Sequence, residues 1–260
     1  MPTRTPKNPP RPAEPRHRAD PQRQSDRSPT TTPDTTQEVD RFLGELAATP
    51  KQPKSGRKGR LVFALDATMS RQPTWDRACH IQADMFEEAA KIGGLEIMLV
   101  YFRGFRECRA SKWHESAAPL QKSMLRIHCE GGYTQIGRVL KKALREAKAG
   151  KVDAVVYVGD CCEEEIDPLC GMAGELGLIG VPVFVFQEGR EPYATKVFKE
   201  IARLSGGAWC PFDLASASQL KDLLSAVAVY AAGGRTALED YGKQRGGDVK
   251  LLVDRFPGNR

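Results

Sequence analysis

The stretch LVFALDATMS, residues 61–70, decides the fold of this chain. Its first five residues are apolar without interruption, which is typical of a parallel strand that is buried on both faces. A carboxylate follows at Asp66, and hydroxyls follow at Thr68 and Ser70. Groups just past the carboxyl end of such a strand project into the crevice where open α/β sheets bind ligands. Three oxygens in one turn suit a hard cation such as Mg²⁺, so we expect part of a metal site here.

Strand-like and helix-like segments alternate after this stretch. Continuous apolar runs predict strands at residues 95–102, 155–158, 181–186 and 208–212. Apolar residues spaced three and four apart predict helices at residues 73–93, 116–128, 136–147, 166–177, 193–204 and 220–232. A more polar run at residues 105–113 predicts an edge strand that pairs antiparallel with the preceding strand. The pattern therefore predicts an α/β fold with a largely parallel sheet and helices on both faces.

The charge and the prolines are concentrated at the start of the chain. Residues 1–60 hold 13 Lys and Arg against 7 Asp and Glu, a net charge of +6, whereas the remaining 200 residues hold 26 of each. Eleven of the 18 prolines precede residue 60. We therefore expect residues 1–57 to be a disordered Pro- and Arg-rich tail. Nucleic-acid binding by this tail is the weakest of the functions considered, and steep salt dependence would reveal it.

One short amphipathic helix is expected inside this tail, at about residues 36–48. Residues 35–38 have the spacing of a capping box, and Val39, Phe42, Leu43 and Leu46 follow on one helical face. A helix of this length is marginal in water, so it needs a surface to pack on. Its own domain and a partner protein both remain open at this stage.

The folded domain is expected at residues 58–234, followed by a polar C-terminal tail at residues 235–260. In that tail only residues 249–253 and Phe256 form an apolar patch, which would either add a strand or bind a partner. No run approaches the roughly 20 apolar residues of a membrane span, and no apolar segment follows the basic N-terminus as in a signal peptide.

The cysteines support a reducing compartment. The chain has seven, an odd number, with no CxxC pair, so reduced thiols are expected and not a disulfide framework. We therefore expect a cytoplasmic protein. Adjacent Cys161 and Cys162 admit a soft-metal or redox role, but packing is the favoured interpretation because cysteine is among the most buried residue types. The four histidines have no spaced partners that would form a zinc set.

Oxygen ligands stand at three places that an α/β topology gathers at one edge of the sheet. Asp66, Thr68 and Ser70 follow the first strand, Thr134 lies in a Gly-Gly-Tyr-Thr loop that opens a helix, and Asp160 follows the strand at residues 155–158. Each of these residues alone has an ordinary explanation, such as a helix cap. Their order along the α/β pattern is more specific and predicts that all five belong to one metal site.

In these residues the sequence resembles the von Willebrand factor type A (VWA) family, over about residues 60–232. The family's metal-ion-dependent adhesion site (MIDAS) uses Asp-x-Ser-x-Ser after the first strand, a Thr in a later Gly-rich loop and an Asp after a middle strand. The resemblance implies a doubly wound, mostly parallel six-stranded sheet with one antiparallel edge strand. It also implies Mg²⁺ or Mn²⁺ held by Asp66, Thr68, Ser70, Thr134 and Asp160. Thr68 stands where the family usually has Ser, and its methyl group restricts χ1 and crowds the site.

The resemblance further implies what the site does. In the family, a Glu or Asp of a partner protein completes the coordination shell, so the contact depends on the metal and chelators abolish it. We therefore expect a metal-dependent protein-binding module without chemistry of its own. Cytoplasmic members of the family are often accessory subunits of larger assemblies, commonly with AAA-type ATPases, and such an assembly is the expected partner.

Two other functions remain as alternatives. Haloacid-dehalogenase-like phosphatases also place a nucleophilic Asp after a first apolar strand and bind Mg²⁺ with a later Gly-Asp, so Asp66 would be the nucleophile. Two residues argue against this: Thr68 stands where most of those enzymes have a second Asp, and Met69 replaces their usual glycine. In addition, Thr134 lies in a Gly-rich loop that opens a helix and not at the end of a strand. The other alternative is a metal-free structural VWA scaffold whose partner binds elsewhere.

Three acidic residues, Glu163–Glu165, follow shortly after Asp160. We expect them to form a solvated helix N-terminus, where the helix dipole favours negative charge. The alternative is that they border the metal site and repel acidic partners that are wrongly positioned.

Overall fold

The structure is a computed structural model that describes residues 33–49, 58–75, 80, 95–150, 152–213 and 217–245. The strands are β1 (Gly59–Asp66), β2 (Leu95–Arg103), β3 (Glu107–His114), β4 (Ala154–Gly159), β5 (Val183–Glu188) and β6 (Trp209–Phe212). The helices are α1 (Pro33–Ala48), the 3₁₀ turn η1 (Met69–Arg71), α3 (Ala117–Met124), α4 (Ile136–Ala149), α5 (Ile166–Leu178), α6 (Pro192–Ser205) and α7 (Ala217–Arg245). The predictions for residues 1–32, for most of the helix at 73–93 and for the apolar patch at 249–256 lie outside the described residues.

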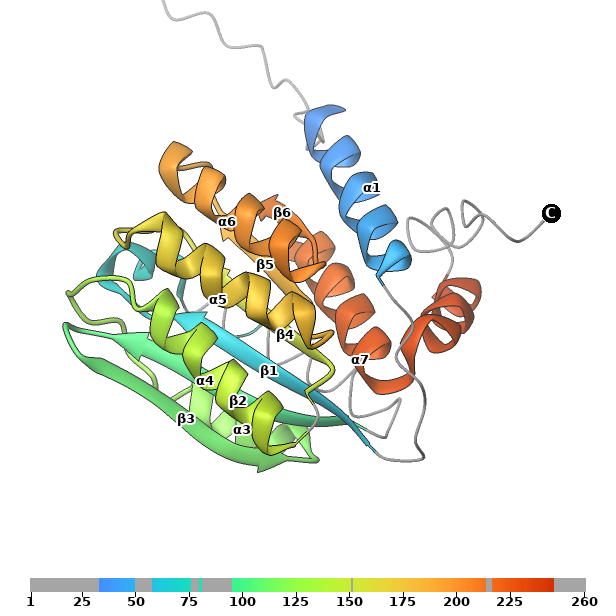
Figure 1. The fold of residues 1–260 in the computed structure, drawn as a ribbon, viewed down its shortest axis with the longest axis horizontal. Coiled ribbons are helices and arrows are strands. Elements are labelled where there is room, and N and C mark those ends of the chain that lie inside the picture. Colours follow the sequence, from blue (N-terminus) through green and yellow to red (C-terminus); the bar gives the residue numbers. More distant parts are fainter. Residues whose placement is uncertain are drawn as a thin grey trace, which may run out of the picture. The chain divides into compact units, whose positions relative to one another are not determined.

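The strands form one sheet in the order β3-β2-β1-β4-β5-β6 (Figure 1). Five of them run parallel, and β3 pairs antiparallel with β2 at the edge, as its polar sequence predicted. The doubly wound, mostly parallel fold class is thereby confirmed. β1 lies inside the sheet between β2 and β4, so both of its long edges are hydrogen-bonded. That position explains why its sequence is apolar throughout.

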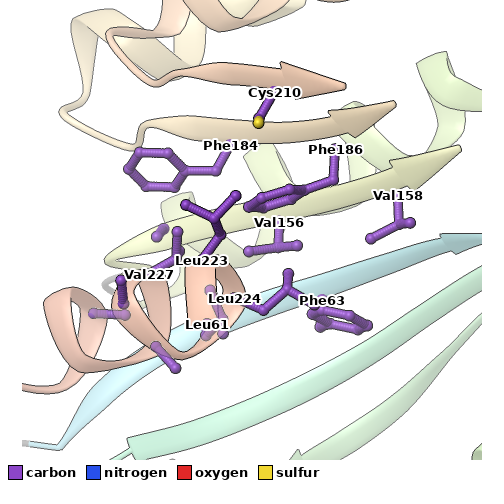
Figure 2. Close-up of a cluster of buried hydrophobic side chains, with 14 of the residues drawn as sticks. Leu61, Phe63, Val156, Val158, Phe184, Phe186, Cys210, Leu223, Leu224 and Val227 are labelled. Carbon is purple, nitrogen blue, oxygen red and sulfur yellow. The ribbon is translucent and has the colours of Figure 1, made fainter. Parts of the chain in front are cut away.

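Both faces of the sheet are covered by helices, because successive side chains of each strand point to opposite faces. On one face α1, α3 and α7 pack over a core that includes Phe63 of β1, and on the other face α4, α5 and α6 pack over a core that includes Val62 (Figure 1). Figure 2 shows the first of these cores, where Leu224 and Val227 of α7 lie among strand residues such as Phe63 and Phe184. The two layers of helices leave the ends of the strands as the accessible part of the sheet.

Helix α1 packs on its own domain. The Phe42 ring lies 5.1 Å from the ring of Phe186 and 6.0 Å from that of Phe184, measured between ring centroids. Phe42 and Leu46 are fully buried, and Val39 and Leu43 nearly so. The amphipathic face that the sequence predicted is therefore the one that docks, and it covers β5 and β6. This contact answers the question that the sequence left open.

Helix α7 extends beyond the glycines that were expected to end the last helix. Gly234 has φ 67° and ψ −160°, a non-helical conformation that divides α7 into two segments. The second segment continues to Arg245, and its Leu238 is buried in the same core as α1. Neither α7 nor any other helix in the described part of the chain is long and apolar enough to cross a membrane.

Candidate metal centre

The centre lies where the chain changes direction across the sheet. From β1 the chain goes to β2 on one side, and it later returns to β4 on the other side. The carboxyl ends of β1 and β4 therefore flank a topological switch point, the usual ligand crevice of an open α/β sheet. Leu65 pairs with Val158 in the register of these strands, so the residues that follow them emerge at the same level.

Two predicted carboxylates meet at this point. One carboxylate oxygen of Asp66, one of Asp160 and the Sγ atom of Cys161 lie within 4.8 Å of one another. The structure thus brings together the two acidic residues that the sequence proposed as ligands. It also adds Cys161, the residue after Asp160, which was not among the predicted ligands.

The Asp66 carboxylate is fully buried and only half satisfied. Its Oδ1 accepts a hydrogen bond from the Thr68 amide at 2.8 Å, whereas Oδ2 has no partner among the described residues. The pKa of Asp66 is raised to about 7, chiefly by burial and to a smaller extent by the charge of Asp160, against the lowering effects of the Thr68 hydrogen bonds and the Arg71 charge. A bound cation would favour the charged form of the Asp66 carboxylate and so lower its pKa.

Asp160 has an equivalent unsatisfied oxygen. Its Oδ1 is buried and lacks a hydrogen-bond partner within the described part of the chain. Buried polar atoms are nearly always paired, so two such carboxylate oxygens from adjacent strand ends need an explanation. A divalent cation bound between the two carboxylates would explain both the unpaired oxygens and the short distance between them, because carboxylate oxygens are common protein ligands of such ions.

The hydroxyls of the first loop border this cluster. The Thr68 and Ser70 oxygens lie 3.1 Å apart in a hydrogen bond, on either side of Met69. Ser70 also hydrogen-bonds to the thiol of Cys161, whose pKa is raised to about 12 by burial and then by the charges of Asp160 and Asp66. Ser70 thus contacts the thiol of the cluster, and Thr68 contacts Asp66 through its backbone amide; the roles of both hydroxyls as ligands stay predictions.

Thr134 reaches the same region through Glu163. The Thr134 side chain is buried, and its Oγ1 accepts a hydrogen bond from the Glu163 amide at 3.0 Å. In return the Thr134 amide donates to the Glu163 carboxylate at 2.7 Å. These bonds tie the Thr134 loop to the segment that follows β4, three residues beyond Asp160. The role of Thr134 as a ligand stays a prediction.

Two of the three acidic residues are not simply solvated, which corrects the sequence expectation. Glu163 binds Thr134, and the Glu164 carboxylate accepts hydrogen bonds from the amides of Ile136 and Gly137 in the first turn of α4. The first amides of a helix have no partner within it, so a carboxylate supplied by another segment stabilises this end. Glu164 is half-buried, whereas Glu163 and Glu165 are exposed, and Glu165 lies at the start of α5. The sequence showed three acids after a strand but could not show which helix they would cap.

A close backbone contact holds the loop before Thr134 in place. A Cβ atom on Gly132 would lie 2.0 Å from the carbonyl oxygen of Gly104, so only glycine fits there. The Gln135 amide group donates to the carbonyl oxygens of Arg103 and Gly104 at 3.1 and 3.2 Å. The loop is thereby fixed against the turn between β2 and β3.

Sequence reasoning missed Arg71, which supports the centre from below. It is 1% exposed, its Nη1 donates to the Asp66 carbonyl oxygen at 3.1 Å, and its Nε donates to Glu188 at 3.0 Å. Its charge is one of the influences that lower the pKa of Asp66. An arginine directly after Ser70 carried no signal of burial, because arginine is mostly a surface residue.

Comparison with known proteins supports this architecture through structure alone. No protein-family model matches the chain, and no curated protein matches it. Among solved structures it resembles a von Willebrand factor type A protein from Catenulispora acidiphila, with a TM-score of 0.54 at 19% identity over 66% of this chain and 43% of that one. It also resembles the SpRpn10 VWA domain, with a TM-score of 0.53 at 11% identity over 64% of this chain and 94% of that one.

A third similar structure is proximal thread matrix protein 1 from the mussel byssus, in a form with a zinc-occupied MIDAS motif. Its TM-score is 0.53 at 14% identity, over 66% of this chain and 46% of that one. This chain therefore covers less than half the length of the mussel protein and of the Catenulispora protein. At such low identity the likeness establishes the fold, which is the α/β fold of VWA domains.

Proposed function

We propose that this chain is a metal-dependent protein-binding module, which binds an acidic side chain of a partner through a divalent cation at the carboxyl edge of the sheet. One observation carries the proposal. Asp66 and Asp160 each have a buried carboxylate oxygen without a hydrogen-bond partner in the described residues, and the two groups lie within 4.8 Å at the switch point. Mg²⁺ or Mn²⁺ is the first candidate, since both take oxygen ligands.

The residues divide into two roles. Asp66 and Asp160 would hold the ion by charge, and the hydroxyls of Thr68, Ser70 and Thr134 would complete the protein's share of ligands directly or through water. Two carboxylates neutralise a dication without filling its shell. A partner carboxylate then has a place on the ion, and the resulting bond is charge-assisted.

The surface around the centre supports binding of a protein. Large apolar side chains are exposed at several points at this edge: Met69, Phe105, Tyr133 and Tyr193. Met69 lies between the two hydroxyl residues, and Tyr133 directly precedes Thr134. The rings of Phe105 and Tyr133 meet edge to face, with their centroids 5.4 Å apart. Exposed aromatic side chains beside a polar centre are typical of protein-binding sites.

The partner of this surface is proposed by its chemistry. It would carry a Glu or Asp for the metal, next to an apolar side chain for the Phe105–Tyr133 pair. Exposed Arg106 and Arg138 lie close by, joined by a hydrogen bond from Arg138 to the Arg106 carbonyl, and they favour a segment with further negative charge. A subunit of a larger assembly, such as an AAA-type ATPase, is the partner that the resemblance to the VWA family implies.

Calorimetric titration of the full chain with Mg²⁺ and Mn²⁺ tests the metal site. We expect binding by the wild type and none by Asp66→Asn or Asp160→Asn. Asp167→Asn is the matched control, because it removes an exposed carboxylate near the start of α5 without touching the cluster. Equal binding by all four proteins would show that the ion binds elsewhere.

Selection from a random peptide library on immobilised protein tests the function itself. In Mg²⁺ we expect enrichment of peptides with a central Glu or Asp beside an apolar residue, and we expect elution by a chelator. Peptides that bind equally in chelator would contradict the proposal. Assay of a generic phosphomonoester in the same buffer provides the test of the phosphatase alternative, and turnover that Asp66→Asn abolishes would favour that enzyme.

A further inference from the structure

A thiol completes the cluster that the two carboxylates begin. The Sγ of Cys161 lies within 4.8 Å of carboxylate oxygens from both Asp66 and Asp160. Two ligands at about 2.2 and 2.3 Å from one zinc ion are at most about 4.5 Å apart, so atoms within this limit need only a small movement to share an ion. The second observation is independent of the cysteine: Asp66 is fully buried, and its Oδ2 has no partner among the described residues.

The neighbouring cysteine shows what an ordinary packed thiol looks like in the same place. Cys162 is buried, belongs to the core beneath α4–α6, and its Sγ lies 3.6 Å from the Glu164 carbonyl oxygen in a hydrogen bond. Cys161 is only partly buried and is absent from both cores. It lies instead among oxygen ligands. Packing therefore accounts for Cys162 and leaves the position of Cys161 unexplained.

Sulfur changes which cation the site prefers. Mg²⁺ binds oxygen ligands and dehydrates reluctantly, so a thiolate contributes little to its affinity. Zn²⁺ is borderline-soft and is bound by Cys, His and carboxylate ligands in protein sites. For divalent ions of this row, Zn²⁺ and Co²⁺ also bind mixed sulfur and oxygen donors more strongly than Mn²⁺. A set of two carboxylates and one thiol thus favours zinc.

We propose that Cys161 is a ligand of the metal centre and that it makes the site selective for Zn²⁺ over Mg²⁺. The inference rests on the proposed function, since it assigns the ion of the same site. Binding forms a metal–sulfur bond at the expense of the S–H bond, and the proton passes to the solvent. With Asp66, Asp160 and Cys161 as direct ligands and the three hydroxyls acting through water, one position of a tetrahedral zinc ion is left open to water or to a partner. That position is where the carboxylate of the partner would bind.

Cobalt is the spectroscopic probe for this assignment. Metal-stripped full chain is titrated with Co²⁺ and Zn²⁺, and with Mg²⁺ for comparison. We expect a sulfur-to-cobalt charge-transfer absorption in the wild type that Cys161→Ser abolishes and Cys162→Ser retains. Cys161→Ser should also lower the affinity for Zn²⁺ by about tenfold or more, since loss of even outer-shell partners costs about 10–100-fold. Its affinity for Mg²⁺ should not change.

X-ray absorption of the zinc-loaded wild type gives a second measurement that needs no variant. We expect one sulfur neighbour at about 2.3 Å from zinc. A zinc shell of oxygen and nitrogen alone, or a cobalt band that survives Cys161→Ser, would overturn the inference. The inference about Cys161 would then be wrong, but the proposed function would stand if Asp66→Asn still abolishes Mg²⁺ binding. If the wild type binds none of Co²⁺, Zn²⁺ and Mg²⁺, the result would instead refute the proposed function.

Discussion

Thr134 and Glu163 hold each other through two reciprocal hydrogen bonds, each from the backbone amide of one residue to a side-chain oxygen of the other, at 2.7 and 3.0 Å. The residues are 29 positions apart, and they join the loop before α4 to the segment after β4. The pair therefore fixes the position of one predicted ligand, Thr134, relative to another, Asp160. A residue outside the recognisable motif thus controls how the motif is assembled.

Substitution of Glu163 tests this control. Glu163→Ala should reduce stability by about 1–2 kcal/mol, because it removes a hydrogen bond to a charged acceptor. It should also lower metal affinity severalfold, since Thr134 is no longer held. Glu163→Gln keeps an acceptor oxygen and should fall between the alanine variant and the wild type. Urea unfolding and metal titration measure the two effects, and wild-type affinity in Glu163→Ala would show that the pair does not position the site.

The raised pKa of Asp66 predicts a pH dependence of the metal-free protein. An unperturbed Asp has a pKa of about 3.9. Between that value and about 7 the folded chain keeps a proton that the unfolded chain has lost. The unfolded state then binds fewer protons, so stability falls as pH rises through this window, by at most about 1.4 kcal/mol per pH unit.

Urea unfolding in chelator between pH 4 and 7 measures this slope. Asp66→Asn should lose it, whereas the exposed-site control Asp167→Asn should keep it. At pH 7, a metal concentration 100 times the dissociation constant should stabilise the wild type by about 2.7 kcal/mol and leave Asp66→Asn unchanged. Identical slopes in wild type and Asp66→Asn would mean that the carboxylate is charged in the fold without a metal.

Helix α1 is predicted to be part of the stable domain. Phe42→Ala should destabilise the protein by about 3–5 kcal/mol, because Phe42 is fully buried against Phe184 and Phe186. Gln37→Ala on the exposed side of the same helix should change stability by less than about 0.5 kcal/mol. Denaturant unfolding measures both. A small effect of Phe42→Ala would show that α1 detaches readily from the sheet.

The aromatic pair beside the centre is predicted to act in partner binding and not in stability. Phe105→Ala and Tyr133→Ala remove side chains that are 69% and 61% exposed, so the domain should unfold at nearly the wild-type denaturant concentration. Binding of a selected acidic peptide should weaken by about 1 kcal/mol or more for each variant. Exposed Leu178, at the end of α5, provides the matched control, and Leu178→Ala should leave peptide affinity unchanged. Equal losses in all three variants would refute a specific role for the pair.

The sequence predicted the architecture because its strongest signals are local. Residues 61–65 could be assigned to a buried strand from composition alone, and the polar run at 105–113 could be assigned to the edge. Asp66 and Asp160 were found in the same way. Each follows a parallel strand, and the carboxyl ends of such strands meet at one edge of the sheet.

What the sequence could not determine depends on contacts between segments far apart along the chain. Cys161 and Cys162 lie in the loop after β4, and only their tertiary contacts separate them: Cys161 lies beside Asp66 and Asp160, whereas Cys162 belongs to the core beneath α4–α6. Glu163 and Glu164 became partners of the Thr134 loop because that loop lies against the end of β4.

By itself, then, the sequence determined the fold class and identified the two carboxylates of the centre. Both can be recognised locally, because hydrophobic periodicity and the residues that follow a strand depend on short stretches of sequence. Only the tertiary structure decided that α1 docks on β5 and β6, that Arg71 is buried beneath Asp66, and that a thiol joins the carboxylates. Each of these depends on packing across the sheet, where the free energy of burial is shared among residues that no local pattern connects.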